Sequence, residues 1–205
     1  AGDTWLGTVT AGLVRKRFGK FRTFGTAEGL KSLHIWSMTQ GPDDSIWFGT
    51  YGGGLHRLKD GKVIKVFDTS NGLSNNTVRA VYAGKDGRIW VGTNGGGLDI
   101  IDPATGAIKN YNQAGFGLSD DFIYAINADK TGNTWVVTYF GKLNRVRNGN
   151  LTIFAQNNGL PGHAIWSIYP DPEEEGTIWL GTDGGGLVRY KDHKFTVFTH
   201  RHGLY

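Results

Sequence analysis

The chain has 205 residues, a net charge of +4 and no cysteine. Disulfide bonds, thiolate catalysis and cysteine-based metal sites are therefore excluded, and no apolar run is long enough to span a bilayer. Aromatic residues make up 13% of the chain, and its 33 glycines recur at regular intervals, which favours a packed all-β protein over a disordered one. The chain begins with Ala1 and carries no signal peptide, so we expect a mature or excised segment.

A tryptophan-centred motif recurs five times, at intervals of 42 to 45 residues. Its pattern is Trp-x-Gly-Thr, followed within a few residues by a glycine run and a leucine. A second marker, Gly-Leu, keeps the same interval. A period of about 40–50 residues with strand-like content is typical of propeller blades. The motif tryptophans are Trp5, Trp47, Trp90, Trp135 and Trp179, and the markers begin at Gly29, Gly72, Gly117, Gly159 and Gly203.

The first repeat starts at its second strand, because Trp5 already belongs to one. The first blade is thus predicted to lack its innermost strand, which leaves an unpaired strand edge. We expect a part of a larger propeller, or a homo-oligomer in which a second chain supplies the pairing. A self-contained five-blade ring with one thin blade is the third alternative. The approximate repeats are 1–30, 31–73, 74–118, 119–160 and 161–205.

The first repeat also carries much of the excess positive charge. A solvated outer strand explains such a cluster, and a patch for a polyanion is the alternative. No other repeat extends the cluster, so we expect no nucleic-acid partner. The residues are Arg15, Lys16, Arg17, Lys20 and Arg22.

The third repeat shows the pattern of one blade most clearly. Four short runs rich in β-forming residues are separated by turns, among them the Asp86-Gly87 turn and the glycine run 95–97. The predicted strands are 77–82, 89–93, 98–101 and 107–111. Four strands make one blade, and no helix is predicted anywhere. The predicted fold class is therefore all-β, a β-propeller with about five four-stranded blades in a single domain or fragment over residues 1–205.

The recurring tryptophans are expected in the core between blades. Blades stack face to face, so a middle strand is buried on both faces and an indole fills the wide space between sheets. A tryptophan that stacks on a ligand should instead differ from blade to blade, because a ligand lacks the rotational symmetry of the repeats.

At these motifs the chain resembles the two-component regulator propeller repeat family, whose pattern runs Gly-Leu-Ser/Pro, a strand, Asp-x-x-Gly, Trp-x-Gly-Thr and Gly-Gly-Leu. Residues 29–55, 72–98 and 159–187 match it almost throughout. The fourth repeat departs from it, with Val137 in place of a glycine and residues 139–142 in place of the glycine run. The resemblance implies a non-enzymatic sensor module of a bacterial two-component receptor, periplasmic or extracellular, that binds a carbohydrate fragment. Any kinase would lie elsewhere in the parent protein.

Positions that differ between repeats predict the ligand site. Six residues past each marker leucine, near the start of the innermost strands, lies a residue expected beside the channel mouth. Aromatic rings stack on sugar faces, and a guanidinium donates to hydroxyls or carboxylates. Packing between blades, with one arginine in a hydrated channel, is the alternative. These residues are Trp36, Arg79, Tyr124 and Trp166.

Two sets of loops are expected on the same face as these residues. One set follows the Gly-Thr pair and opens with Val9, Tyr51, Asn94, Tyr139 or Asp183. The other enters each blade and carries His34, Asn75, Asn76, Asp120, Asp121 and His163. Loops on a rigid scaffold commonly carry function, so Tyr51, Asn94, Tyr139, Asp183, His34 and His163 are predicted to bind ligand. Solvated loop residues are the alternative.

Other chemistry finds little support in the sequence. The glycine runs lack the Lys-Ser/Thr of a phosphate loop, and no His-Glu-x-x-His motif occurs. His200 and His202 could alternate on one strand face and bind a metal adventitiously, but neither a cofactor nor a dedicated metal site is predicted. A second hypothesis is a propeller lyase or glycan-active enzyme, using His34 or His163 with Asp120 or Asp183. A third is a protein-interaction scaffold that assembles through its open blade edge.

Overall fold

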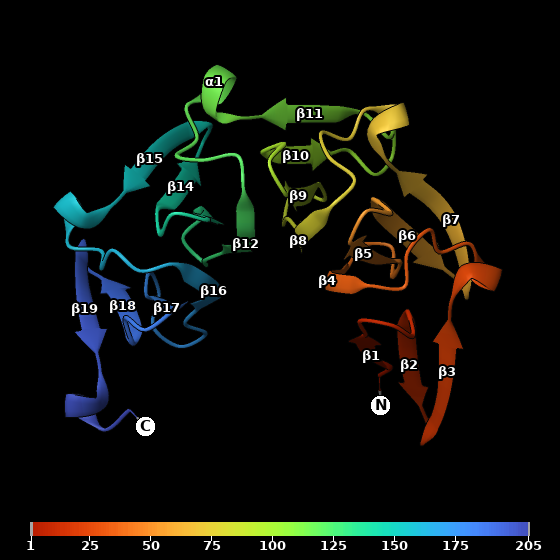
Figure 1. The fold of residues 1–205 in the computed structure, drawn as a ribbon, viewed down its shortest axis with the longest axis horizontal. Helices are drawn as coiled ribbons and strands as arrows, with labels where there is room; N and C mark the ends of the chain where they lie inside the picture. Colours follow the sequence, from red (N-terminus) through yellow and green to blue (C-terminus); the bar gives the residue numbers. More distant parts are fainter. Residues whose placement is uncertain (1, 205) are drawn as a thin grey trace. The chain divides into compact units, whose positions relative to one another are not determined.

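Five antiparallel sheets make up the fold of residues 2–204, the part of the chain that this computed structural model describes (Figure 1). Strands consecutive in the sequence pair within each sheet, as in propeller blades. The chain divides into two compact units, residues 1–110 and 111–205, which are taken separately below.

The first unit contains one three-stranded and two four-stranded sheets. The three-stranded sheet confirms that the first blade lacks its innermost strand. Its strands are β1 (Thr4–Gly7), β2 (Leu13–Arg17) and β3 (Lys20–Phe24). The second blade has β4 (Ile35–Gln40), β5 (Ile46–Thr50), β6 (Leu55–Lys59) and β7 (Lys62–Phe67). The third has β8 (Val78–Ala83), β9 (Ile89–Thr93), β10 (Leu98–Ile101) and β11 (Ile108–Tyr111).

The second unit contains two four-stranded sheets. The fourth blade has β12 (Ile123–Ala128), β13 (Thr134–Thr138), β14 (Leu143–Arg147) and β15 (Asn150–Phe154). The fifth has β16 (Ile165–Pro170), β17 (Ile178–Thr182), β18 (Leu187–Lys191) and β19 (Lys194–Phe198). The prediction of an all-β fold built from propeller blades is confirmed.

The prediction that no helix occurs was wrong, because one helical turn precedes each Gly-Leu marker. Each turn ends at the marker glycine, whose φ lies between +80° and +106°. Glycine adopts this left-handed conformation without steric cost, so it stops the helix after three or four residues and redirects the chain into the next blade. These segments are the 3₁₀ turns Thr26–Glu28, Thr69–Asn71, Gln156–Asn158 and His200–His202 and the helix α1 (Gln113–Phe116).

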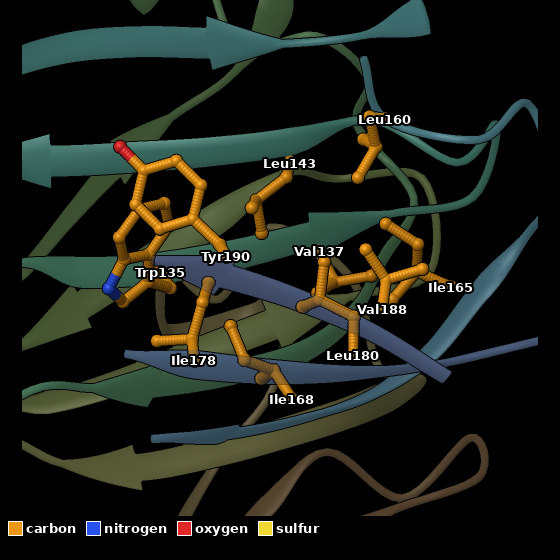
Figure 2. Close-up of a cluster of buried hydrophobic side chains, with 10 residues drawn as sticks. All are labelled: Trp135, Val137, Leu143, Leu160, Ile165, Ile168, Ile178, Leu180, Val188 and Tyr190. Carbon is orange, nitrogen blue, oxygen red and sulfur yellow. The ribbon is translucent and has the colours of Figure 1, made fainter. Parts of the chain in front are cut away.

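Hydrophobic side chains from facing sheets form the core within each unit. In the second unit, Trp135 and Val137 of β13 pack with Ile178 and Leu180 of β17 and with Tyr190 of β18 (Figure 2). Trp47 is fully buried in the equivalent place of the first unit, in a cluster that joins the second and third blades. Both indoles therefore lie in the core, as predicted. Trp5, Trp90 and Trp179 are only partly buried.

A buried polar side chain on the third strand anchors the loop that enters each of three blades. It accepts the backbone N–H of the residue directly after the marker leucine, 25 positions earlier. The pairs are His56 with Lys31 (3.0 Å), Asp99 with Ser74 (2.9 Å) and Asn144 with Ser119 (3.0 Å). The fifth blade has Pro161 after its marker, which offers no N–H, and the apolar Val188 stands at the third-strand position.

Candidate functional site

A register irregularity marks the first strand of each four-stranded blade. The pairing of the first strand with the second skips one residue in every case, as a β-bulge does. Bulges re-aim side chains and are over-represented beside functional sites. The skipped residues are Trp36, Arg79, Tyr124 and Trp166, the four predicted to lie at the channel mouth.

In the first unit, five predicted residues form one continuous group, here called the cation–aromatic cluster: His34, Trp36, Tyr51, Arg79 and Asn94. The Arg79 guanidinium carbon lies 4.2 Å from the Trp36 ring centroid, and Arg79 Nε donates to Asn94 Oδ1 at 2.7 Å. The Trp36 centroid lies 5.5 Å from that of Tyr51 and 5.4 Å from that of His34. Trp36 Nε1 also donates to His34 Nε2 at 2.5 Å, so both rings are held in place.

In the second unit, rings gather into what we call the aromatic cluster: Phe122, Tyr124, Tyr139, Phe140 and Trp166. Tyr124 stacks on Tyr139 at a centroid distance of 5.5 Å, and Trp166 meets Tyr124 edge to face at 4.9 Å. Phe122 and Phe140 contact Tyr139 at 6.4 and 4.8 Å. Phe140 is 70% exposed and Trp166 is 48% exposed, so the cluster offers open ring faces to solvent.

Phe122 and Phe140 were missed by sequence reasoning, although the repeat register carries the signal for both. Phe122 stands four residues after its marker leucine, as His34 does in the second blade. Phe140 stands where the second blade has Gly52. The fold of a blade therefore does not require an aromatic side chain at either position.

Backbone hydrogen bonds hold the two kinds of loop side by side in each four-stranded blade. The residue after the Gly-Thr pair donates its N–H to a carbonyl of the entering loop at 2.8 to 3.0 Å. The donor and acceptor pairs are Tyr51 with His34, Asn94 with Thr77, Tyr139 with Phe122 and Asp183 with Ala164.

The fourth blade keeps its turn despite its unusual sequence. Thr138 N donates to Lys142 O at 3.1 Å, as Thr50 N does to Gly54 O at the same distance in the second blade. The positive φ moves to Gly141, so Tyr139 and Phe140 are displayed on a turn that closes normally.

His163 and Asp183 lie outside the aromatic cluster. A Cβ on Gly185 would approach the His163 ring to 2.7 Å, which places this histidine against the loop between β17 and β18. Within residues 2–204, no hydrogen bond or ring contact joins the His163 or Asp183 side chain to the cluster.

Two of the four residues considered for acid–base chemistry have other partners. His34 Nε2 accepts the Trp36 N–H, and Asp120 Oδ1 accepts the backbone N–H of Phe122 at 2.9 Å. In the described part of the chain, His163 makes no hydrogen bond or ion pair with Asp120 or Asp183. Residues 2–204 contain no group of three or more potential metal ligands. They also contain no helix long and apolar enough to cross a membrane.

Comparison with known proteins identifies the repeats. Residues 29–52 and 72–95 match the family model described as two component regulator propeller. No curated protein has a matching sequence.

Solved structures match over nearly the whole chain. The extracellular domain assigned to the hybrid two-component system BT3049 from B. thetaiotaomicron is 25% identical, with a TM-score of 0.64, and the match covers 99% of this chain and 33% of that one. The extracellular domain of BT4673 from the same organism is 19% identical, with a TM-score of 0.79, over 97% of this chain and 30% of that one. The WD40 propeller domain of Doa1 is 20% identical, with a TM-score of 0.71, over 98% and 62%. The chain thus spans about a third of the length of the two extracellular domains, and two of its repeats match the two-component regulator propeller model, as the sequence motifs predicted.

Proposed function

We propose that this chain is the ligand-sensing propeller module of a bacterial two-component receptor, without enzymatic activity, and that it binds a carbohydrate fragment. The observation that carries this proposal is the set of four bulges that display Trp36, Arg79, Tyr124 and Trp166. Each four-stranded blade has this bulge, but the side chain at the skipped position is Trp in two blades, Arg in one and Tyr in another.

The chemistry of the two clusters suits a sugar. Exposed ring faces stack against the C–H faces of a pyranose, and Trp166 and Phe140 offer such faces. Arg79 is held between the Trp36 ring and Asn94, so its guanidinium is oriented before a ligand arrives. A pre-oriented fork of N–H donors binds hydroxyls or carboxylates with less loss of conformational entropy.

The comparisons support the receptor assignment. The BT3049 domain is described as extracellular and as belonging to a hybrid two-component system. By analogy this module lies in the periplasm or outside the cell, and signal transmission would require parts of a receptor beyond the propeller repeats.

The experiment compares the wild type with the double variant Trp36→Ala, Trp166→Ala. An oligosaccharide array selects the best-binding glycan, and isothermal titration calorimetry measures its affinity. Loss of two stacking rings should weaken binding roughly tenfold or more. Tyr169→Ala is the matched control, because Tyr169 is 59% exposed on the same strand, β16, and belongs to neither cluster.

Folding of each variant is checked by circular dichroism and thermal denaturation. Unchanged affinity in a well-folded double variant would remove these residues from the site. A wild-type protein that binds no glycan on the array would refute the carbohydrate proposal.

A further inference from the structure

We propose that the hairpin of β2 and β3 docks onto an anionic lipid surface, with Phe18 and Phe21 among the headgroups and its basic side chains on the phosphates. This surface lies in the first blade, which contributes no residue to either cluster. The proposal is therefore independent of the carbohydrate site.

Phe18 is an anomaly of the repeat. It occupies the first position of a two-residue turn and has a φ of +47°. Three other blades have the same conformation at this position, and they place Asp60 (+50°), Asn148 (+51°) and Asp192 (+48°) there. Asp and Asn tolerate the left-handed region, whereas a bulky residue is an outlier in it. Phe18 is 80% exposed, so packing does not explain its presence.

A strained and solvent-exposed phenylalanine does not stabilise the fold, which indicates that it serves an interaction with another molecule. Residues held in sparsely populated backbone conformations cluster at sites of function, where the strain is retained for the interaction that it permits. The tip of a hairpin is also the part of a blade that is most accessible to a flat partner.

The same hairpin concentrates positive charge. Arg15, Lys16, Arg17, Lys20 and Arg22 lie on its two strands. The ion pairs described for these residues involve one carboxylate, Asp3, which lies 3.7 Å from Arg15 and 3.4 Å from Arg17. A surplus of positive charge therefore remains on the hairpin, and it complements an anionic partner.

The charges lie on both faces of the hairpin. Lys16 pairs with Phe21, so these two side chains share one face, whereas Arg15, Arg17, Lys20 and Arg22 share the other face, where with Phe18 they line a hollow of about 280 Å³. The Arg17 guanidinium carbon lies 5.4 Å from the Phe18 ring centroid, and Lys16 Nζ lies 5.8 Å from that of Phe21. β3 is an edge strand of its sheet (Figure 1). Phe21 on this strand is 65% exposed.

Lipid is favoured over a soluble polyanion by the two phenylalanines. A polyanion would be held mainly by the cations, and a nucleic acid would need unpaired bases to stack on these rings. Phenylalanine has no polar atom, so insertion of an exposed hairpin tip into an apolar environment relieves its contact with water. Basic side chains beside apolar rings are the combination that binds the interface of an anionic bilayer.

The test is co-sedimentation of the full chain with vesicles of phosphatidylcholine alone or mixed with phosphatidylglycerol. Binding is expected only to the mixed vesicles, and it should weaken as salt is raised. Phe18→Asn installs the residue of the fourth blade, so it should raise the melting temperature while weakening vesicle binding roughly tenfold. Loss of binding then cannot be attributed to unfolding.

Charge is tested with a matched pair of variants. Lys20 begins β3 as Lys194 begins β19, in the equivalent hairpin of the fifth blade. Lys20→Gln should weaken vesicle binding about fivefold, whereas Lys194→Gln should leave it unchanged.

Three results would overturn the proposal. One is equal vesicle binding by wild type and Phe18→Asn. Another is an equal effect of the two lysine variants, which would indicate non-specific attraction by net charge. The third is binding to heparin or to a single-stranded oligonucleotide without binding to mixed vesicles, which would identify a polyanion site.

Discussion

Asp99 and His56 occupy the same position of the repeat, yet burial shifts their pKa values in opposite directions. Both side chains are fully buried and accept the N–H that opens a blade. Burial disfavours the charged form of each group, so it raises the pKa of the Asp99 carboxyl and lowers that of the His56 imidazole from 6.5 to about 4. Asn144, the third member of the set, performs the same task without a titratable group.

Asp99→Asn is therefore expected to stabilise the protein at neutral pH. Because the folded pKa of Asp99 is raised, its contribution to stability is lost as pH rises through that pKa. An asparagine can accept from Ser74 N and donate to Ser74 Oγ, as Asn144 does with Ser119, although it gives up the hydrogen bond that Asn110 Nδ2 donates to Asp99 Oδ1 at 3.0 Å. We expect a gain on the order of 1 kcal/mol at pH 7 and a smaller gain in acid.

Urea denaturation of both proteins at pH 7 and pH 5 measures this effect. A variant that is less stable than the wild type at pH 7 would show that the ionised carboxylate contributes more through its hydrogen bonds than it costs by burial.

The sequence repeat predicted the positions of strands and turns better than it predicted the local backbone conformation. In the third blade, residues 77–82, 89–93, 98–101 and 107–111 were predicted as strands, and β8 to β11 lie within one residue of these bounds. The helical turns were missed because a single turn has no hydrophobic periodicity. The bulges were missed because a bulge is a property of the pairing between two strands, and neither strand alone records it.

The glycine run between the second and third strands combines two different requirements. Gly52 and Gly54 both have positive φ, of +74° and +82°. A Cβ on Gly52 would meet nothing within 4 Å, whereas a Cβ on Gly54 would lie 2.2 Å from the carbonyl oxygen of Phe67. Gly52 is therefore required only by its backbone conformation, whereas Gly54 is required both by its backbone conformation and by the close approach of β7.

Alanine at the two positions should separate these effects. Gly52→Ala is expected to destabilise the protein by about 1 kcal/mol, the cost of a left-handed alanine. Gly54→Ala adds a clash with backbone that cannot move aside, and we expect a total loss of about 3 kcal/mol or more. Thermal or chemical denaturation of both variants measures the difference, and equal losses would show that β7 shifts to make room.

Comparison of equivalent positions in the repeats predicted one part of the candidate site and not the other. Comparing equivalent positions selected His34, Trp36, Tyr51, Arg79 and Asn94, and the structure joins these five by ring contacts and hydrogen bonds. The same comparison selected His163 and Asp183, which lie apart from the aromatic cluster. Sequence position places a side chain on a loop, but its contacts depend on the rotamer and on the side chain that the neighbouring blade presents.

The pH dependence of the protein's overall stability should reveal the buried histidine. Since the folded pKa of His56 is lowered, protonation favours the unfolded state, and stability falls as pH decreases from 6.5 to about 4. The shift corresponds to a loss of about 3 kcal/mol over that window. Asp99 acts in the opposite direction, because burial raises its pKa and the carboxyl therefore takes up a proton more readily in the folded than in the unfolded state.

A second loss is expected in stronger acid, from carboxylates with lowered pKa values. The Lys31 ammonium, 2.6 Å away, and the Ser70 hydroxyl lower the pKa of Asp68 to about 2, and hydrogen bonds from Ser45, Lys59 and Arg57 lower that of Asp43. Their contribution is present above pH 3.8 and is lost below it. Acid unfolding is therefore expected to have two stages that differ in the groups responsible.

The variant His56→Asn separates the two stages. An asparagine can accept the Lys31 N–H as Asn144 accepts that of Ser119, but it does not titrate. Its free energy of unfolding should be lower than that of the wild type at pH 7, because the stacking of His56 on Phe48 at 5.1 Å is lost. Between pH 6.5 and 4 it should not show the decline of the wild type, and below pH 3.8 the two proteins should lose stability in parallel. Denaturation series across this range measure both slopes, and an unchanged decline in the variant would assign the first stage to another group.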